Sequence, residues 1–275
     1  MALRAATVLL SLMGSASASK VPAAPSAGCA RGYETATAGT ATAATLVVGN
    51  SSTATRTYTV YVPTVADRTR ARSGDGLAQP LPLVLNFHGW KSTGTELMNN
   101  SDGNDVAEAN GFLNVYPDGM GDHPSATLDG PSGWGSWNTG GSTASPGPAG
   151  PTCNGDHSAD ALCYTSCAQR PGGCDAQGCD WTTCADDLGF VEALLDHLES
   201  TMCVDRNRVY ATGFSNGAML VYTLGMALSQ RFAAIAPVEG GVHPGFLSRP
   251  EVPVALLEIH GTQDVTVPIN GSDGM

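Results

Sequence analysis

A serine framed by two glycines is the residue of this chain whose surroundings best suit chemistry. Residues 213–217 read G-F-S-N-G, a G-x-S-x-G motif, between a short apolar run at 209–211 and an apolar stretch at 218–224. A strand, a sharp turn and a buried helix, in that order, expose the serine oxygen at the edge of a sheet. The two glycines remove Cβ atoms that would collide in such a turn. We therefore predict that Ser215 is a nucleophile, and a glycine-rich turn without chemistry is the alternative.

A serine hydroxyl attacks poorly at neutral pH unless a general base and oxyanion donors surround it. The backbone N–H of Asn216, the residue after the nucleophile, is expected to be one donor. The backbone N–H of Trp90 is expected to be the second, because Gly89 lets the turn after the apolar run at 83–87 approach a substrate. His88, in the same turn, is expected to support the loop rather than transfer protons.

An acid must orient the base, and the residue predicted for this role is Asp264. It follows a late apolar run at 253–259, so it should lie at the same sheet edge as Ser215. Asp118 and Asp205 are rivals, but both look like turn residues.

The general base is harder to place. The expected order along the chain is serine, acid and then histidine, yet no histidine stands between Asp264 and Met275. His260 lies in the wrong place on its strand end to bridge Asp264 and Ser215. His243 could approach Ser215, but we favour a base beyond Met275, about 30 to 50 residues further on, in a chain that is truncated at its C-terminus.

The elements that must position these residues alternate between strands and helices. Apolar or alternating runs predict strands at 45–48, 57–62, 83–87, 112–116, 209–211, 233–238 and 253–259. Helical spacing predicts helices from 101 or 102 to 110, from 186 to 202, and directly after the serine turn. Repeated strand–helix–strand units with apolar strands indicate an α/β fold, whose mostly parallel central sheet carries helices on both faces.

The chain divides into an export signal and one domain. Residues 1–18 combine a basic start, an apolar run and an A-S-A site, which is typical of a cleaved signal peptide. Residues 19–43 are expected to be loosely ordered and pinned by Cys29. The domain is expected to cover 44–275, with a cysteine-rich insertion at about 119–184. No later run is long enough to span a bilayer, so we expect a soluble, secreted, extracellular protein.

The composition and charge of the chain exclude several classes of binding partner. A formal net charge of −12 argues against nucleic acid and against anionic membrane surfaces. The even number of cysteines, eight, indicates disulfides in an exported chain, and a zinc site is disfavoured because the spacings form no C-x-x-C pair. We expect no metal, no organic cofactor and a monomer. Asn50, Asn99 and Asn270 begin possible glycosylation sequons.

Two tryptophans inside the insertion could contact a substrate. Trp134 and Trp137 belong to the patch W-G-S-W-N at 134–138. Their rings could line a cleft, or they could anchor the long loop onto the body of the domain, and the sequence favours neither.

These motifs, taken in order, resemble the secreted feruloyl esterases and the related polyhydroxybutyrate depolymerases, with acetyl xylan esterases nearby. The resemblance runs from about residue 57 to 268. Its carriers are L-V-L-N-F-H-G at 83–89, Y-P-D-G at 116–119, S-W-N at 136–138, A-D-D-L-G-F at 185–190, C-V-D at 203–205, V-Y-A-T-G-F-S-N-G at 209–217 and H-G-T-Q-D with V-P at 260–268. It implies an α/β-hydrolase fold, incomplete at the C-terminus, with Ser215 as nucleophile and Asp264 as acid.

The resemblance implies a serine carboxylic ester hydrolase that cleaves hydroxycinnamate esters of plant or algal polysaccharide. A polyester depolymerase acting on polyhydroxybutyrate is the nearest alternative. A second alternative is a secreted binding module that keeps the hydrolase scaffold without catalysis.

Overall fold

The computed structural model describes residues 22–31, 33, 36–48, 54–66, 78–121, 134–139, 164–168, 182–242 and 249–269. The expected signal peptide, His243 and most of the cysteine-rich insertion lie outside these ranges. Within them, no helix is both long enough and apolar enough to cross a bilayer.

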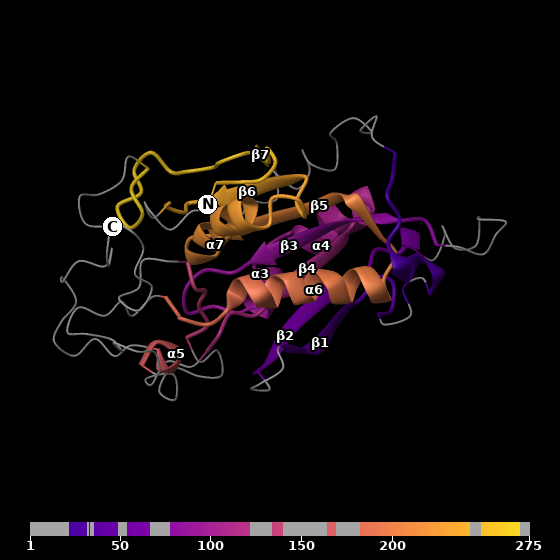
Figure 1. Ribbon diagram of the computed structural model, residues 1–275, viewed down its shortest axis with the longest axis horizontal. Coiled ribbons are helices and arrows are strands. Elements are labelled where there is room, and N and C mark those ends of the chain that lie inside the picture. The colour runs from indigo at the N-terminus through magenta and orange to yellow at the C-terminus, as the bar shows by residue number, and fades with distance from the viewer. Residues whose placement is uncertain are drawn as a thin grey trace.

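A seven-stranded sheet forms the centre of the described part, in the order β1-β2-β4-β3-β5-β6-β7 (Figure 1). The strands are β1 (Ala41–Val48), β2 (Ala54–Tyr61), β3 (Leu81–Phe87), β4 (Leu113–Pro117), β5 (Val204–Phe214), β6 (Ala234–Val238) and β7 (Ala255–Leu256). Strands β4, β3, β5, β6 and β7 pair in parallel, whereas β1 and β2 are antiparallel to each other and β2 is antiparallel to β4. The mostly parallel sheet is therefore confirmed.

Helices cover both faces of this sheet because the apolar strands have no polar face to expose. The helical elements are η1 (Ala27–Ala30), α3 (Gly94–Asn99), α4 (Gly103–Asn110), α5 (Thr165–Ala168), α6 (Asp187–Thr201) and α7 (Asn216–Ala227). Leu83 and Leu85 of β3 belong to the main core with α6 and α7, while Val84 between them packs with Val106 of α4 on the other side. In Figure 1, α6 lies across the front of the central strands.

The N-terminal segment is more ordered than expected. Cys29 forms a disulfide with Cys203, which directly precedes β5. The Ala24 backbone N–H donates to the Asp205 carboxylate at 2.9 Å, and the Ser26 hydroxyl donates to the Met202 carbonyl at 2.8 Å. The described part of residues 19–43 is therefore tied to the sheet at the end opposite Ser215, rather than loose.

Candidate active site

Ser215 occupies a sharp turn between β5 and α7. Its backbone has φ 54° and ψ −121°, in the left-handed region that costs a non-glycine residue about 1–3 kcal/mol. The Ser215 N–H donates to the Val238 carbonyl of β6 at 2.9 Å, and the Ser215 carbonyl accepts from Met219 N–H at 3.0 Å. These bonds hold the strained residue at the carboxyl end of the sheet. The predicted strand, turn and helix are confirmed.

The glycine after the serine is required by close packing. A Cβ atom on Gly217 would lie 2.3 Å from the Phe87 carbonyl oxygen and 2.4 Å from that of His88. A Cβ atom on Gly213 would lie 2.6 Å from the Gly217 carbonyl oxygen. Only residues without a Cβ let α7 begin this close to the end of β3. These contact distances explain why both outer positions of the G-x-S-x-G motif are glycine.

The turn after β3 passes directly beside the serine. A Cβ atom built on Gly89 would lie 3.5 Å from the Ser215 Cβ and 3.3 Å from a ring carbon of Phe214. The next peptide carries the N–H of Trp90, so this donor belongs to the turn that lies beside Ser215. Its role as an oxyanion donor stays a prediction.

His88 supports this turn from behind, as predicted. Its side chain is buried, its Nδ1 donates to the Gly89 carbonyl at 2.7 Å, and its Nε2 accepts from the Gly119 N–H at 2.8 Å. Burial lowers the pKa of His88 to about 4, so the ring is neutral near pH 7. Because Nε2 must accept from a backbone N–H, the proton lies on Nδ1.

The side chain of Asn216 faces into the protein and not toward an ester. Its Oδ1 accepts from the Ser136 hydroxyl at 3.1 Å and from the Trp137 N–H at 2.9 Å. These bonds fasten the first residue of α7 to the segment 134–139. The backbone N–H at this helix start carries the positive end of the helix dipole, which favours a developing oxyanion. That donor role also stays a prediction.

Trp137 is buried, so the structure favours the anchoring alternative for it over contact with a substrate. The side chain has 0% exposure, packs edge-on against Phe87 with ring centroids 5.2 Å apart, and donates from Nε1 to the His88 carbonyl at 2.9 Å. A buried indole whose N–H is already bonded is an anchor. It joins the segment 134–139 to the turn that faces Ser215.

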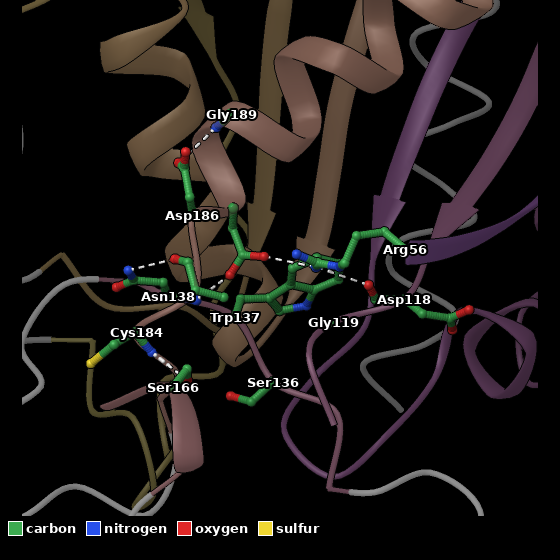
Figure 2. A network of polar contacts seen from close by, with 12 residues as sticks. Arg56, Asp118, Gly119, Ser136, Trp137, Asn138, Ser166, Cys184, Asp186 and Gly189 are labelled. Atoms are coloured by element: carbon green, nitrogen blue, oxygen red, sulfur yellow. Dashed lines mark hydrogen bonds and ion pairs between the residues drawn. The ribbon is translucent and has the colours of Figure 1, made fainter. Parts of the chain in front are cut away.

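The buried ion pair between Arg56 and Asp187 also holds the segment 134–139 in place (Figure 2). Arg56 donates to Asp187 Oδ1 at 2.7 Å, and Asp187 Oδ2 accepts from the Asn138 N–H at 2.6 Å. The guanidinium also lies 4.0 Å from the centre of the Phe190 ring. Burial raises the pKa of the Asp187 carboxyl, and Arg56 and the Asn138 N–H oppose that rise. We assign the ionised form, because both carboxylate oxygens accept hydrogen bonds.

Ser215 and Asp264 line one pocket of about 700 Å³. Asp264 belongs to the loop after β7, where its Oδ1 accepts from the backbone N–H groups of Thr266 and Val267 at 2.8 and 2.9 Å. These bonds fix the carboxylate in one orientation. The structure thus brings the predicted nucleophile and the predicted acid to the same cavity at the same sheet edge.

His260 turns toward the loop of Asp264. Its Nε2 donates to the Val267 carbonyl at 2.5 Å and lies 3.5 Å from Asp264 Oδ2, while its Nδ1 lies 3.4 Å from a carboxylate oxygen of Glu258. The ring is not part of the pocket that Ser215 lines. This agrees with the prediction that His260 does not bridge Asp264 and Ser215, although its contact with Asp264 was not foreseen.

The two rival acids have structural roles. Asp118 accepts from the Gly94 N–H at 2.7 Å and from the Thr57 hydroxyl at 2.6 Å, which fastens α3 to β2. Asp205 is fully buried near the start of β5, at the opposite end of that strand from Ser215. Neither lines the pocket of Ser215.

Trp134 lies beside the predicted oxyanion turn. Its ring meets that of Trp90 edge-on, with centroids 5.9 Å apart, and Lys91 Nζ lies 3.4 Å from the centre of the Trp134 ring. Both indoles are half-buried. A substrate-binding role for Trp134 stays a prediction.

Three residues of the site were not predicted from the sequence. Glu239 follows β6, has a positive φ of 52° and lines the Ser215 pocket. Lys91 contacts both indoles, and Asp187 holds the segment of Trp137. Of the three, only Asp187 had a signal in the sequence, the doubled acid D-D at 186–187. A helix start needs one capping acid, and Asp186 already caps α6 by accepting from the Gly189 N–H at 2.9 Å.

Within the described ranges, no group of three His, Cys, Asp or Glu side chains could hold a metal ion.

Comparison with known proteins finds partial similarity to esterases. No protein-family model matches the chain. A feruloyl esterase C of Emericella nidulans is 35% identical over 89 residues, which are 32% of this chain and 33% of that enzyme. The Nocardia uniformis protein named "Putative esterase NocK" is 28% identical over 226 residues, 82% of this chain and 52% of that protein. The chain thus spans about a third of the length of the curated feruloyl esterases it matches.

Among solved structures, a thermostable esterase aligns with a TM-score of 0.51 at 19% identity, over 84% of this chain and 49% of that one. This likeness concerns the overall fold alone. The chain therefore has the fold of this esterase and is similar, over about a third of its length, to feruloyl esterases.

Proposed function

We propose that the protein is a secreted, monomeric serine carboxylic ester hydrolase that cleaves hydroxycinnamate esters of cell-wall polysaccharide. The observation that carries this proposal is the shared pocket of Ser215 and Asp264, with Ser215 on a strained turn. A strained backbone persists where surrounding bonds hold it, and such positions cluster at active sites. The partial homology to feruloyl esterases supports the substrate class.

The proposed reaction is acyl transfer through Ser215. The hydroxyl attacks the ester carbonyl, and the N–H groups of Asn216 and Trp90 hold the oxyanion. The proton passes to a histidine, whose second ring nitrogen donates to Asp264 Oδ2, because Oδ1 already accepts two backbone bonds. The histidine returns this proton to the alcohol of the polysaccharide, which leaves, and water then releases the acid from Ser215.

Two substitutions test the proposal in protein expressed from its complete coding sequence. Ser215→Ala should abolish hydrolysis of methyl ferulate. Asp264→Asn should lower kcat by about 10²–10⁴-fold, as in other serine triads, while KM changes less than twofold because the amide oxygen can still accept from the backbone. Equal activity of the Ser215→Ala variant would overturn the proposal.

The substrate panel separates the alternatives. A feruloylated arabinoxylan oligomer and a hydroxybutyrate trimer are each incubated with the wild-type protein. Faster release from the trimer would assign the polyester activity instead. Turnover of neither ester, with retained oligosaccharide binding, would assign a binding module.

A further inference from the structure

A corner of two indoles with a lysine between them lies next to the Ser215 turn. Trp90 and Trp134 meet at 82°, and Lys91 Nζ lies 4.7 Å from the centre of the Trp90 ring and 3.4 Å from that of Trp134. We call these three residues the indole corner. Gly89 directly precedes Trp90, and a Cβ atom built on Gly89 would lie 3.5 Å from the Ser215 Cβ, so a ligand on the corner would adjoin an ester at Ser215.

The indole corner is built rigidly from three chain segments. The Lys91 N–H donates to the Gly135 carbonyl at 2.9 Å. Trp90 Nε1 donates to the hydroxyl of Tyr164 at 3.0 Å, and that hydroxyl donates to the Trp134 carbonyl at 2.5 Å. The Tyr164 side chain is fully buried. A surface that is already fixed loses little entropy when a ligand binds.

Backbone strain is concentrated in the same corner. Lys91 has φ 61° and Trp134 has φ 56°, both in the region that favours glycine. Neither position holds a glycine, so the strained backbone here presents side chains. Such outliers are found where a ligand site requires a fixed direction.

The charge of Lys91 points to an anion. The chain has a formal net charge of −12, yet among the described residues no carboxylate lies within ion-pair distance of Lys91, and its side chain is exposed. The nearby Glu96 instead accepts from the Ser92 hydroxyl at 3.0 Å. An ammonium held over aromatic rings keeps its outer side available to an acidic group.

From these observations we propose that the indole corner binds an anionic sugar residue of the polysaccharide that carries the ester. Sugar rings stack their C–H faces on indoles, and the sugar's carboxylate or sulfate would pair with Lys91. The acyl group of the ester fits this site less well, because its esterified carboxyl carries no negative charge that could pair with the Lys91 ammonium. This inference rests on the proposed esterase function and adds the substrate class.

Binding to the Ser215→Ala form tests the corner without turnover. Calorimetry compares a neutral xylo-oligosaccharide with one of equal length bearing a uronate, and with a sulfated one, to identify the source of the anion. We expect the better anionic ligand to bind about threefold more tightly than the neutral one, the scale of an exposed ion pair, and the difference to vanish near 0.5 M salt.

Substitutions assign the effect to residues. Lys91→Gln should remove the preference, Lys91→Arg should keep it, and Trp134→Ala should weaken binding of every oligosaccharide. Arg206→Gln is the matched control, because Arg206 is exposed near the other end of β5. Equal affinity for neutral and anionic sugars, a preference that survives Lys91→Gln, or no binding at all would overturn the proposal.

The esterase proposal and the sugar-site proposal can be refuted independently of each other. If the wild-type protein cleaves no ester while the Lys91-dependent preference persists, the catalytic assignment is wrong and the sugar site stands. If esters are cleaved and sugars of both charges bind alike, the catalytic assignment stands and the anionic subsite is wrong.

Discussion

Arg56 and Asp187, 131 residues apart in the chain, meet at 2.7 Å with side chains that are only 5% and 1% exposed. Asp187 also accepts from the Asn138 N–H, next to Trp137, whose own N–H reaches Asn216. The pair thus connects β2 and α6 to the first residue of the helix behind Ser215. In Figure 2, dashed lines run from Arg56 and from Asn138, the two residues that donate to the Asp187 carboxylate.

Removing one partner of this pair should be costly. Arg56→Met leaves the Asp187 carboxylate buried without its counter-ion, and we expect the free energy of unfolding to fall by about 3–5 kcal/mol. The double substitution Arg56→Met with Asp187→Leu should recover most of that loss, because no buried charge remains. Urea unfolding at pH 7 measures both. A double variant no more stable than the single one would contradict this account of the pair.

His88 should make stability depend on pH. An unfolded histidine binds a proton below about pH 6.5, whereas folded His88 has a pKa of about 4, so unfolding takes up a proton between these values. Stability should therefore be complete above pH 6.5 and fall by roughly 3 kcal/mol as the pH drops toward 4.

The variant His88→Gln isolates this contribution from that of other groups. Its loss of stability between pH 6.5 and 4 should be smaller than that of the wild-type protein. NMR titration of the wild-type ring gives an independent reading, since its signals should not shift above about pH 5. A ring that titrates near pH 6.5 would contradict the buried, neutral histidine.

Gly217 and Gly241 provide a matched pair of glycines. A Cβ on Gly217 would meet two backbone oxygens at 2.3 and 2.4 Å, whereas one on Gly241 would meet a Val267 methyl at 3.5 Å, an ordinary contact. Gly217→Ala should destabilise the protein by several kcal/mol, roughly 3 or more, since backbone cannot move aside as a side chain can. Gly241→Ala should change stability by less than about 1 kcal/mol. Similar thermal midpoints for both variants would refute the packing argument.

The Cys29–Cys203 disulfide should contribute strongly to folding, because it closes a loop of 174 residues. Replacing both cysteines by alanine should lower the free energy of unfolding by about 2–5 kcal/mol. The double variant is compared with wild-type protein by urea unfolding without reductant. Unchanged stability would show that the N-terminal segment is held by its hydrogen bonds alone.

The turn that carries Ser215 and the strands of the sheet could be predicted because their signals are local. The G-x-S-x-G motif lies where β5 ends and α7 begins, and the apolar strands β3 and β4 can be predicted directly from the sequence. Helix α3 was missed because it spans only 6 residues, although Thr93 and Glu96 form a capping sequence whose hydroxyl accepts from the Glu96 N–H.

The surroundings of Ser215 could not be predicted because they depend on distant contacts. Whether Trp137 is exposed is decided by Phe87 and by the His88 carbonyl, 49 residues earlier in the chain. Lys91 and Trp134 meet only because two strained turns place them together. Local patterns carry no information about such pairings, which arise from tertiary packing.

The most direct test of the central claim is labelling by an aryl organophosphonate, followed by peptide mass spectrometry, on protein expressed from its complete coding sequence. The account predicts one phosphonyl group per chain, on Ser215, lost in the Ser215→Ala variant and slowed at least tenfold in Asp264→Asn. An adduct on another residue, or no adduct on protein that is folded by circular dichroism, would contradict the assignment of Ser215 as an activated nucleophile.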